Sequence, residues 1–251
     1  TYFDNDAVVL PRHSKYCLLD GLPRQLHAVS HDAEKRQLIG ARHEHKHLSR
    51  VGHGKGDILK TTLFAKLVCV FVNKYASLDP FGTGIEMEAD KPNWYDALNG
   101  LPALFGSSSS ESFELKRLAL ILAEAAGSHN AAIALPEEVA EFFAALSDLS
   151  SGYEAGGVDD LVFWNKSGAL KEEYRRKTKF GFSGAETMVD SAAIVAGCRK
   201  ALKKIEAGLA RAFDRKTGLY CGYFINEVTA YEKLSGNAIM PTAFIQKRLP
   251  Y

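Results

Sequence analysis

Apolar residues recur at helical spacing in several long segments of the chain. In residues 60–78 apolar side chains cover nearly the whole circumference of the predicted helix, which is the pattern of a helix buried in the centre of a protein. The same spacing predicts helices over residues 108–126, 136–149, 160–179 and 186–214. The tail after these helices alternates more like extended structure.

Residues that are favoured at the ends of helices support these boundaries. Ser108 is followed three residues later by Glu111, which fits a helix-capping box, and Pro136 takes the favoured first position of the next helix. Gly168 is the point at which the fourth helix could break, and Gly218 closes the last one. The chain is therefore predicted to be mainly α, an array of α/α hairpins with short extended segments at both ends.

Composition fits one soluble globular domain over residues 1–251, with 46% hydrophobic and 24% charged residues. The 31 basic and 30 acidic residues nearly cancel, so the chain lacks the basic excess typical of nucleic-acid binders. No segment approaches the ~20 apolar residues of a membrane span. The predicted partners therefore include neither nucleic acid nor membrane.

The four cysteines are widely spaced and form no CxxC motif. Cys69 and Cys198 lie inside apolar helical patterns, where buried free thiols are the simplest interpretation. Free thiols favour the cytoplasm or another reducing compartment.

Residues 79–108 form a long segment with little regular pattern, and such loops are usually functional or disordered. Its aromatic residues argue against disorder, so it is predicted to be an active-site loop. It carries five carboxylates, which are Asp79, Glu86, Glu88, Asp90 and Asp96. Sugar-cleaving sites need a carboxylic acid to protonate the leaving oxygen and aromatic rings to stack on the sugar. A packed loop with carboxylates on turns would show the same composition.

The stretch Asn93-Trp94-Tyr95-Asp96-Ala97-Leu98-Asn99-Gly100 resembles the Asp-Trp-Asn-Asp-Gly-Met-Asn signature of cellobiose phosphorylase and its relatives. Its flanks, from Lys91 to Ser107, are similar to bacterial proteins of the β-glucan phosphorylase type. Softer matches lie at residues 12–16 and 227–232. The specific part of the resemblance is about fifteen residues, and it departs from the family at Asn93 and Ala97.

The resemblance implies that Asp96 is the general acid, with Trp94 and Asn99 matching family positions that contact the sugar. It also implies an (α/α)6 barrel, of which this chain would be an internal part. The helices counted above are too few to close such a barrel, so further protein segments or subunits would have to complete it.

Inverting phosphorolysis needs one acid and no general base, because phosphate is already an anion. Phosphate is then a co-substrate and no cofactor is required. We expect Trp94 and Tyr95 to contact the sugar, and Glu86 or Glu88 to accept bonds from its hydroxyl groups. Phosphate needs cationic or N–H donors, for which Arg12, His13 and Lys15 are candidates, although solvated turn residues look the same.

Other functions remain open at this point. An inverting hydrolase would need a second carboxylate about 6.5–9.5 Å from the acid, with candidates Asp79, Glu86, Glu88 and Glu227. A structural subunit derived from such an enzyme, or a sugar-binding module without chemistry, fits the same sequence. His43, His45 and His47 would share one face of a strand, but no fourth ligand supports a metal, so none is predicted.

Overall fold

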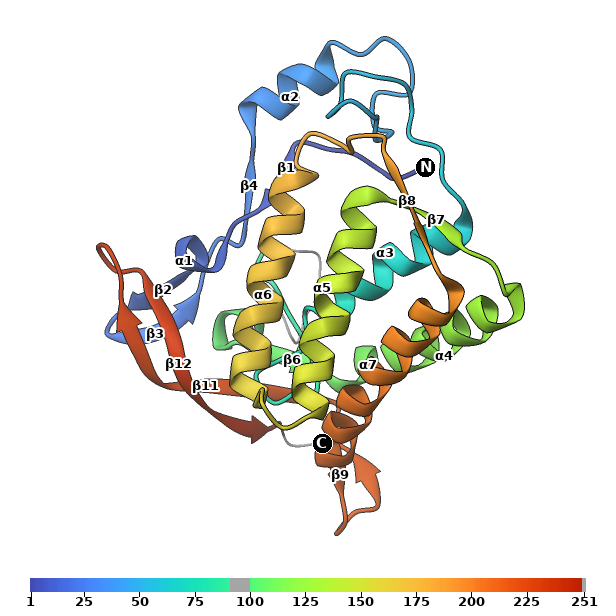
Figure 1. Cartoon of the computed structure of the whole chain (residues 1–251). Coiled ribbons are helices and arrows are strands. Elements are labelled where there is room, and N and C mark those ends of the chain that lie inside the picture. Colours follow the sequence, from blue (N-terminus) through green and yellow to red (C-terminus); the bar gives the residue numbers. More distant parts are fainter. Residues whose placement is uncertain (91–99, 250–251) are drawn as a thin grey trace.

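The structure is a computed structural model that describes residues 1–90 and 100–249 (Figure 1). The helices are α1 (Arg12–Lys15), α2 (Ala33–Gly40), α3 (Leu63–Tyr75), α4 (Ser109–His129), α5 (Glu137–Glu154), α6 (Asp160–Lys177) and α7 (Ser191–Ala212), with a 3-10 turn η2 (Pro102–Leu104).

The strands pair in antiparallel fashion. One sheet has the order β12-β11-β6-β5 and consists of β5 (Ile85–Glu86), β6 (Gly106–Ser108), β11 (Tyr223–Lys233) and β12 (Ile239–Arg248). The two-stranded pairs are β1 (Ala7–Val9) with β4 (Val29–His31), β2 (Tyr16–Leu19) with β3 (Leu22–Gln25), β7 (Ile133–Pro136) with β8 (Glu186–Val189), and β9 (Phe213–Asp214) with β10 (Leu219–Tyr220). The long helices α3 to α7 lie on one side of the molecule, and the hairpins β2–β3 and β11–β12 lie on the other.

This mixed architecture shows that the predicted fold class, a mainly α hairpin array forming part of an (α/α)6 barrel, was wrong. The error arose because several strands are only two to four residues long and pair with segments far away in the sequence. Strand β6, for example, pairs with both β5 and β11. Such short strands carry too little alternation to register as a pattern.

The helices themselves surround one large apolar core. Figure 1 shows α5 and α6 side by side as an antiparallel hairpin, with α7 on the side of α5 away from α6 and α4 packed against α7. Helix α3 supplies Val68, Phe71 and Val72 to this core, as its apolar pattern predicted. Its pattern is not fully buried, however, because Leu63 and Val70 are exposed. Any further protein segments that the barrel prediction calls for would have to cover such side chains.

Local boundaries differ from the predictions for identifiable reasons. Helix α7 begins at Ser191, because residues 186–189 pair with β7 as strand β8. The capping box is absent, because Ser108 belongs to β6 and makes no side-chain cap bond, while Glu111 pairs with Lys74. Helix α6 continues through Gly168 without a break.

Two predictions about buried and apolar groups can be compared directly with the structure. Cys69 and Cys198 are buried free thiols, as predicted. Over the described ranges 1–90 and 100–249, no helix combines the length and apolarity needed to cross a membrane.

Close contact between α7 and the turn at residues 79–84 depends on Gly208. A Cβ at this position would lie 1.6 Å from the carbonyl oxygen of Gly82. We therefore expect Gly208→Ala to lower the free energy of unfolding by about 1–3 kcal/mol in urea titrations, as overpacking does. In the control Gly127→Ala the new methyl group meets only Val195 Cγ2 at 3.7 Å. That helix position should gain up to about 1 kcal/mol. Equal stability of the two variants would contradict the packing described here.

Candidate functional site

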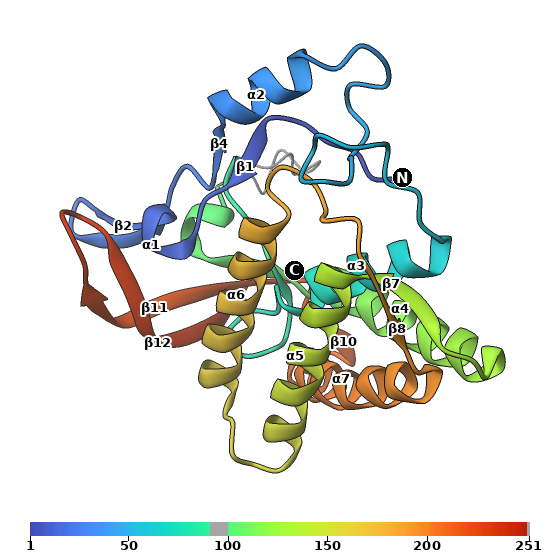
Figure 2. The same ribbon diagram turned by 45° about the horizontal axis from the view of Figure 1, so that its top comes forward.

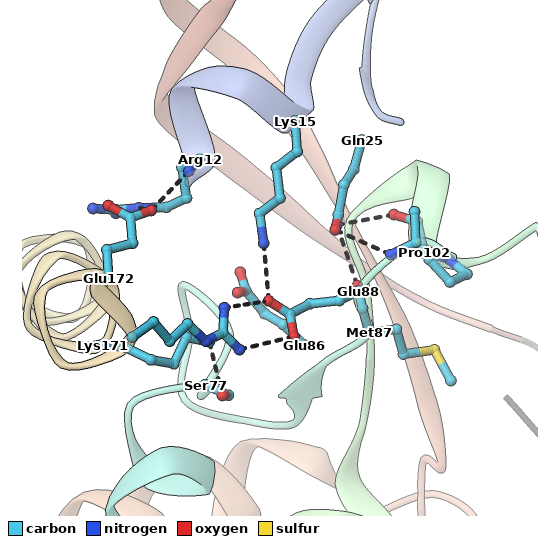
Figure 3. A network of polar contacts seen from close by, with 12 residues as sticks. Arg12, Lys15, Gln25, Ser77, Glu86, Met87, Glu88, Pro102, Lys171 and Glu172 are labelled. Atoms are coloured by element: carbon cyan, nitrogen blue, oxygen red, sulfur yellow. Dashed lines mark hydrogen bonds and ion pairs between the residues drawn. The ribbon is translucent and has the colours of Figure 1, made fainter. Parts of the chain in front are cut away.

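Buried charged side chains gather where the N-terminal strands meet α6, and Figure 3 shows this region. We call this group the charge cluster. It consists of Arg12 and Lys15 from α1, Glu86 and Glu88 from β5 and the residues after it, and Lys171, Glu172 and Arg175 from α6. Segments from three distant parts of the chain therefore meet at one site.

Arg12 joins α1 to α6. Its backbone N–H donates to Glu172 Oε1 at 2.7 Å, and its Nε donates to the same oxygen at 3.0 Å. Its Nη1 donates to Asn165 Oδ1 at 2.9 Å. The guanidinium lies directly on Gly168, where a Cβ would be 2.8 Å from Cζ. Gly168 thus lets a charged side chain lie against the helix backbone, and it does not end the helix.

Glu88 is the centre of the cluster. Lys15 Nζ donates to Glu88 Oε1 at 3.0 Å, and Arg175 binds both carboxylate oxygens at 2.9 and 3.1 Å. The side chains of Lys15 and Glu88 are 5% and 8% exposed. A bidentate arginine contact is the strongest arrangement available to a buried carboxylate, because it satisfies both oxygens at once.

Glu86 and Lys171 form the second half of the cluster. Trp164 Nε1 donates to Glu86 Oε1 at 2.6 Å. Lys171 Nζ donates to Ser77 Oγ at 2.9 Å, and Lys171 is buried. Figure 3 shows Lys15 extending from α1 toward Glu88, while Lys171 and Glu172 enter from α6.

Burial and neighbouring charges move the pKa values of these groups apart. Burial alone would raise the pKa of Glu88, but Lys171, Arg175 and Lys15 outweigh it and hold that pKa well below its ordinary value. Burial raises the pKa of Glu86. Burial, assisted by the like charges of Arg175 and Lys15, lowers the pKa of Lys171 to about 7. Lys171 is therefore the group of the cluster whose charge changes near neutral pH.

The charge balance of the cluster favours an anion. Its basic members are Arg12, Lys15, Lys171 and Arg175, and its acidic members are Glu86, Glu88 and Glu172, so basic groups exceed acidic groups by one. A cavity of about 10 Å³ lies among these residues beside Tyr16 and Trp164. That volume holds roughly one water molecule. A larger ligand therefore requires side chains of the cluster to move.

Gln25 forms hydrogen bonds with the stretch of chain that precedes the segment of the predicted acid and with the stretch that follows it. Its Nε2 donates to the carbonyl oxygens of Met87 and Pro102, each at 3.2 Å, and its Oε1 accepts from the Ala89 N–H at 3.2 Å. Gln25 thus holds residues 87 and 89, on either side of Glu88 of the charge cluster, next to Pro102. The side chain of Gln25 is buried, which makes these bonds costly to lose.

The structure brings some of the predicted site residues together and leaves others apart. Arg12, Lys15, Glu86 and Glu88 converge in the charge cluster, although they are engaged with one another and with α6. His13 is exposed and lies outside the cluster. The predicted acid and its neighbours lie outside the described residues; these are Asp96, Trp94, Tyr95 and Asn99.

Two carboxylates considered as bases have structural roles. Asp79 is buried and accepts hydrogen bonds from the turn that follows it and from Ser107 Oγ at 2.6 Å. It holds that turn to the central sheet. Glu227 pairs with Lys247 on the surface of β11 and β12.

His43 and His45 lie in bends and a loop, so they share no strand face. Across the described part of the chain, no three metal-binding side chains are grouped closely enough to hold an ion.

Sequence reasoning missed Lys171, Arg175, Trp164 and Gln25 as members of this site. The basic residues of α6 have acidic residues among them, which is also the pattern of a solvated helix face. One available signal was the spacing of Gly168, Lys171 and Arg175, which places them on one side of a helix. Gln25 had no signal, because its role depends on the β2–β3 hairpin.

Comparison with known protein families and with the sequences of characterised proteins finds no match for this chain.

The lowered pKa of Lys171 predicts a specific pH dependence of stability. Between pH 7 and about 10, the unfolded lysine holds its proton and the folded one does not, so stability rises with pH across this window. The slope approaches ~1.4 kcal/mol per pH unit. Lys171→Met lacks this contribution. The free energy of unfolding of the parent, measured in urea, should therefore rise relative to that of the variant between pH 7.0 and pH 9.5. A constant difference between them would show that folded Lys171 keeps its charge.

Proposed function

We propose that this chain is a carbohydrate-active enzyme that cleaves a β-linked glucan or disaccharide by inverting phosphorolysis. Asp96 protonates the leaving glycosidic oxygen, and phosphate attacks the anomeric carbon from the opposite face. The observation that supports this proposal is the convergence of Arg12, Lys15, Glu86 and Glu88 in one charge cluster. Glu86 and Glu88 belong to the stretch of chain that precedes Asp96 in the sequence.

When Lys171 is protonated, the cluster carries one positive charge in excess, and this excess is the physical reason to expect phosphate here. An uncompensated buried charge is costly, and a bound anion removes that cost. The carboxylate oxygens of Glu88 and Glu172 accept the hydrogen bonds of Lys15, Arg175 and Arg12 that phosphate oxygens could accept instead. Glu172 is the more exposed of the two, with 26% of its side chain accessible. We expect phosphate to displace Glu172 from Arg12, because Glu88 is held by more donors.

The same residues argue against hydrolysis. A hydrolase needs a free carboxylate to activate water. Asp79 is engaged in its turn, and the pKa of Glu88 is held too low for a useful base. Of the other two carboxylates of the cluster, Glu172 is bound by Arg12, and burial raises the pKa of Glu86. Glu86 is therefore the base to test if the chain releases free sugar without phosphate.

The activity test uses the purified chain with β-linked gluco-disaccharides and oligosaccharides, in the presence and absence of inorganic phosphate. We expect glucose 1-phosphate to form only with phosphate. Asp96→Asn should reduce its formation by about 10²–10⁴-fold, because that is the usual contribution of a general acid. The measurement is the initial rate of glucose 1-phosphate release.

The matched control is Asp90→Asn, a nearby carboxylate with a positive φ of 62° that asparagine also tolerates. Its rate should stay close to that of the parent. Unchanged turnover in Asp96→Asn would refute the assignment of the acid. Sugar release that is independent of phosphate and lost in Glu86→Gln would instead identify a hydrolase.

A further inference from the structure

A groove of about 700 Å³ lies beside the charge cluster and shares Glu172 and Arg175 with it. One wall consists of residues 7–11, which include β1. The other wall consists of the C-terminal half of α6 and residues 178–179. Figures 1 and 2 show β1 passing the C-terminal end of α6. The groove is large enough for a ligand of several residues.

The strand edge of β1 faces this groove. Five consecutive residues line it, whereas one face of a strand would contribute only every second residue. The pairing with β4 shows which backbone groups are free. Leu10 N–H donates to Ala28 and Asp32 N–H donates to Asp6, so the even-numbered residues of this stretch bond to β4. The N–H and C=O groups of Ala7 and Val9 therefore point the other way.

These outward backbone groups are largely unpaired. The Ala7 N–H donates to Asn5 Oδ1 at 3.1 Å. For the N–H and C=O of Val9, the described part of the chain supplies no hydrogen-bond partner, and it places no third strand beside β1. An open strand edge of this kind is a template for another extended segment.

The charges around the groove indicate what such a segment carries. Basic side chains in its lining outnumber acidic ones; they are Lys35, Arg175, Arg176 and Lys179, against Glu172 and Glu173, and His13 also lines it. Lys35, Arg175 and Lys179 are already paired with Asp4, Glu88 and Asp32. Arg176 is 71% exposed and, among the described residues, pairs only with its helix neighbour Glu173, a kind of contact that contributes little. The described lining includes no Phe, Tyr or Trp on which a sugar ring could stack.

We propose that this groove binds an extended acidic peptide segment, which adds to β1 as a further strand. Main-chain bonds to Val9 hold its backbone, and its carboxylates face Arg176 and Lys179. The apolar residues of the β1 wall pack against its alternate side chains. The groove shares Glu172 and Arg175 with the charge cluster, but peptide binding to β1 does not depend on the proposed phosphorolysis.

The test titrates the full chain with the acetylated, amidated peptide Glu-Val-Glu-Val-Glu, and with Lys-Val-Lys-Val-Lys as the charge-reversed probe. Binding of the acidic peptide should shift the Val9 amide resonance in NMR spectra and protect that amide from hydrogen exchange. Higher salt should weaken the binding, because exposed charges contribute to it.

Two variants separate the backbone and charge contributions. Val9→Pro removes the outward N–H without touching the bonds to β4, and it should weaken binding about tenfold or more, whereas Val9→Ala keeps the N–H and should bind like the parent. Arg176→Glu lies on an exposed helix face and should weaken binding roughly tenfold. It tests the same site if the proline variant fails to fold.

Any of three results overturns the proposal. These are an absence of binding by the folded parent at millimolar acidic peptide, equal binding of both peptides, and binding by a folded Val9→Pro that matches Val9→Ala. A cello-oligosaccharide that shifts the Val9 and Arg176 resonances in place of the peptide would also overturn it, because the groove would then belong to a carbohydrate site.

Discussion

Burial of the Glu88 carboxylate is the constraint on which the arrangement of the site depends. A charge removed from water is tolerated only when opposite charges and hydrogen-bond donors replace its hydration. Lys15 supplies one of these from α1 and Arg175 supplies two from α6. Because the three segments are far apart in sequence, satisfying Glu88 fixes the N-terminal strands against the helical layer. The hydrogen bonds of Gln25 then hold Met87, Ala89 and Pro102 together beside Glu88.

The sequence predicted most of the helices, because their apolar spacing repeats over several turns. Helices α3, α4, α5 and α6 lie within or close to the expected ranges. The central sheet could not be found in this way, since β5 and β6 are two and three residues long and are stabilised by pairing across the chain. One hairpin did carry a usable signal. Asp20 and Gly21 lie between two apolar runs and both have positive φ, as the tight turn between β2 and β3 requires.

The candidate site was predictable in its residue types and not in its connections. Arg12, Lys15, Glu86 and Glu88 were selected because their chemistry suits a charged ligand. Their mutual contacts depend on how α1 approaches α6, and this follows from packing across about 160 positions, for which a single sequence has no local signal. The neutralising partners on α6 therefore stayed hidden, and the cluster proved more occupied by its own ion pairs than an open phosphate site would be.

Gly168 and Arg12 illustrate how closely such a site constrains variation. The guanidinium occupies the space of a missing side chain on α6. Any larger residue at position 168 would displace Arg12, and with it the hold of α1 on Glu172 and Asn165. A side chain at position 168 therefore fits only once Arg12 has been replaced, so a chain that has lost this arginine no longer needs the glycine.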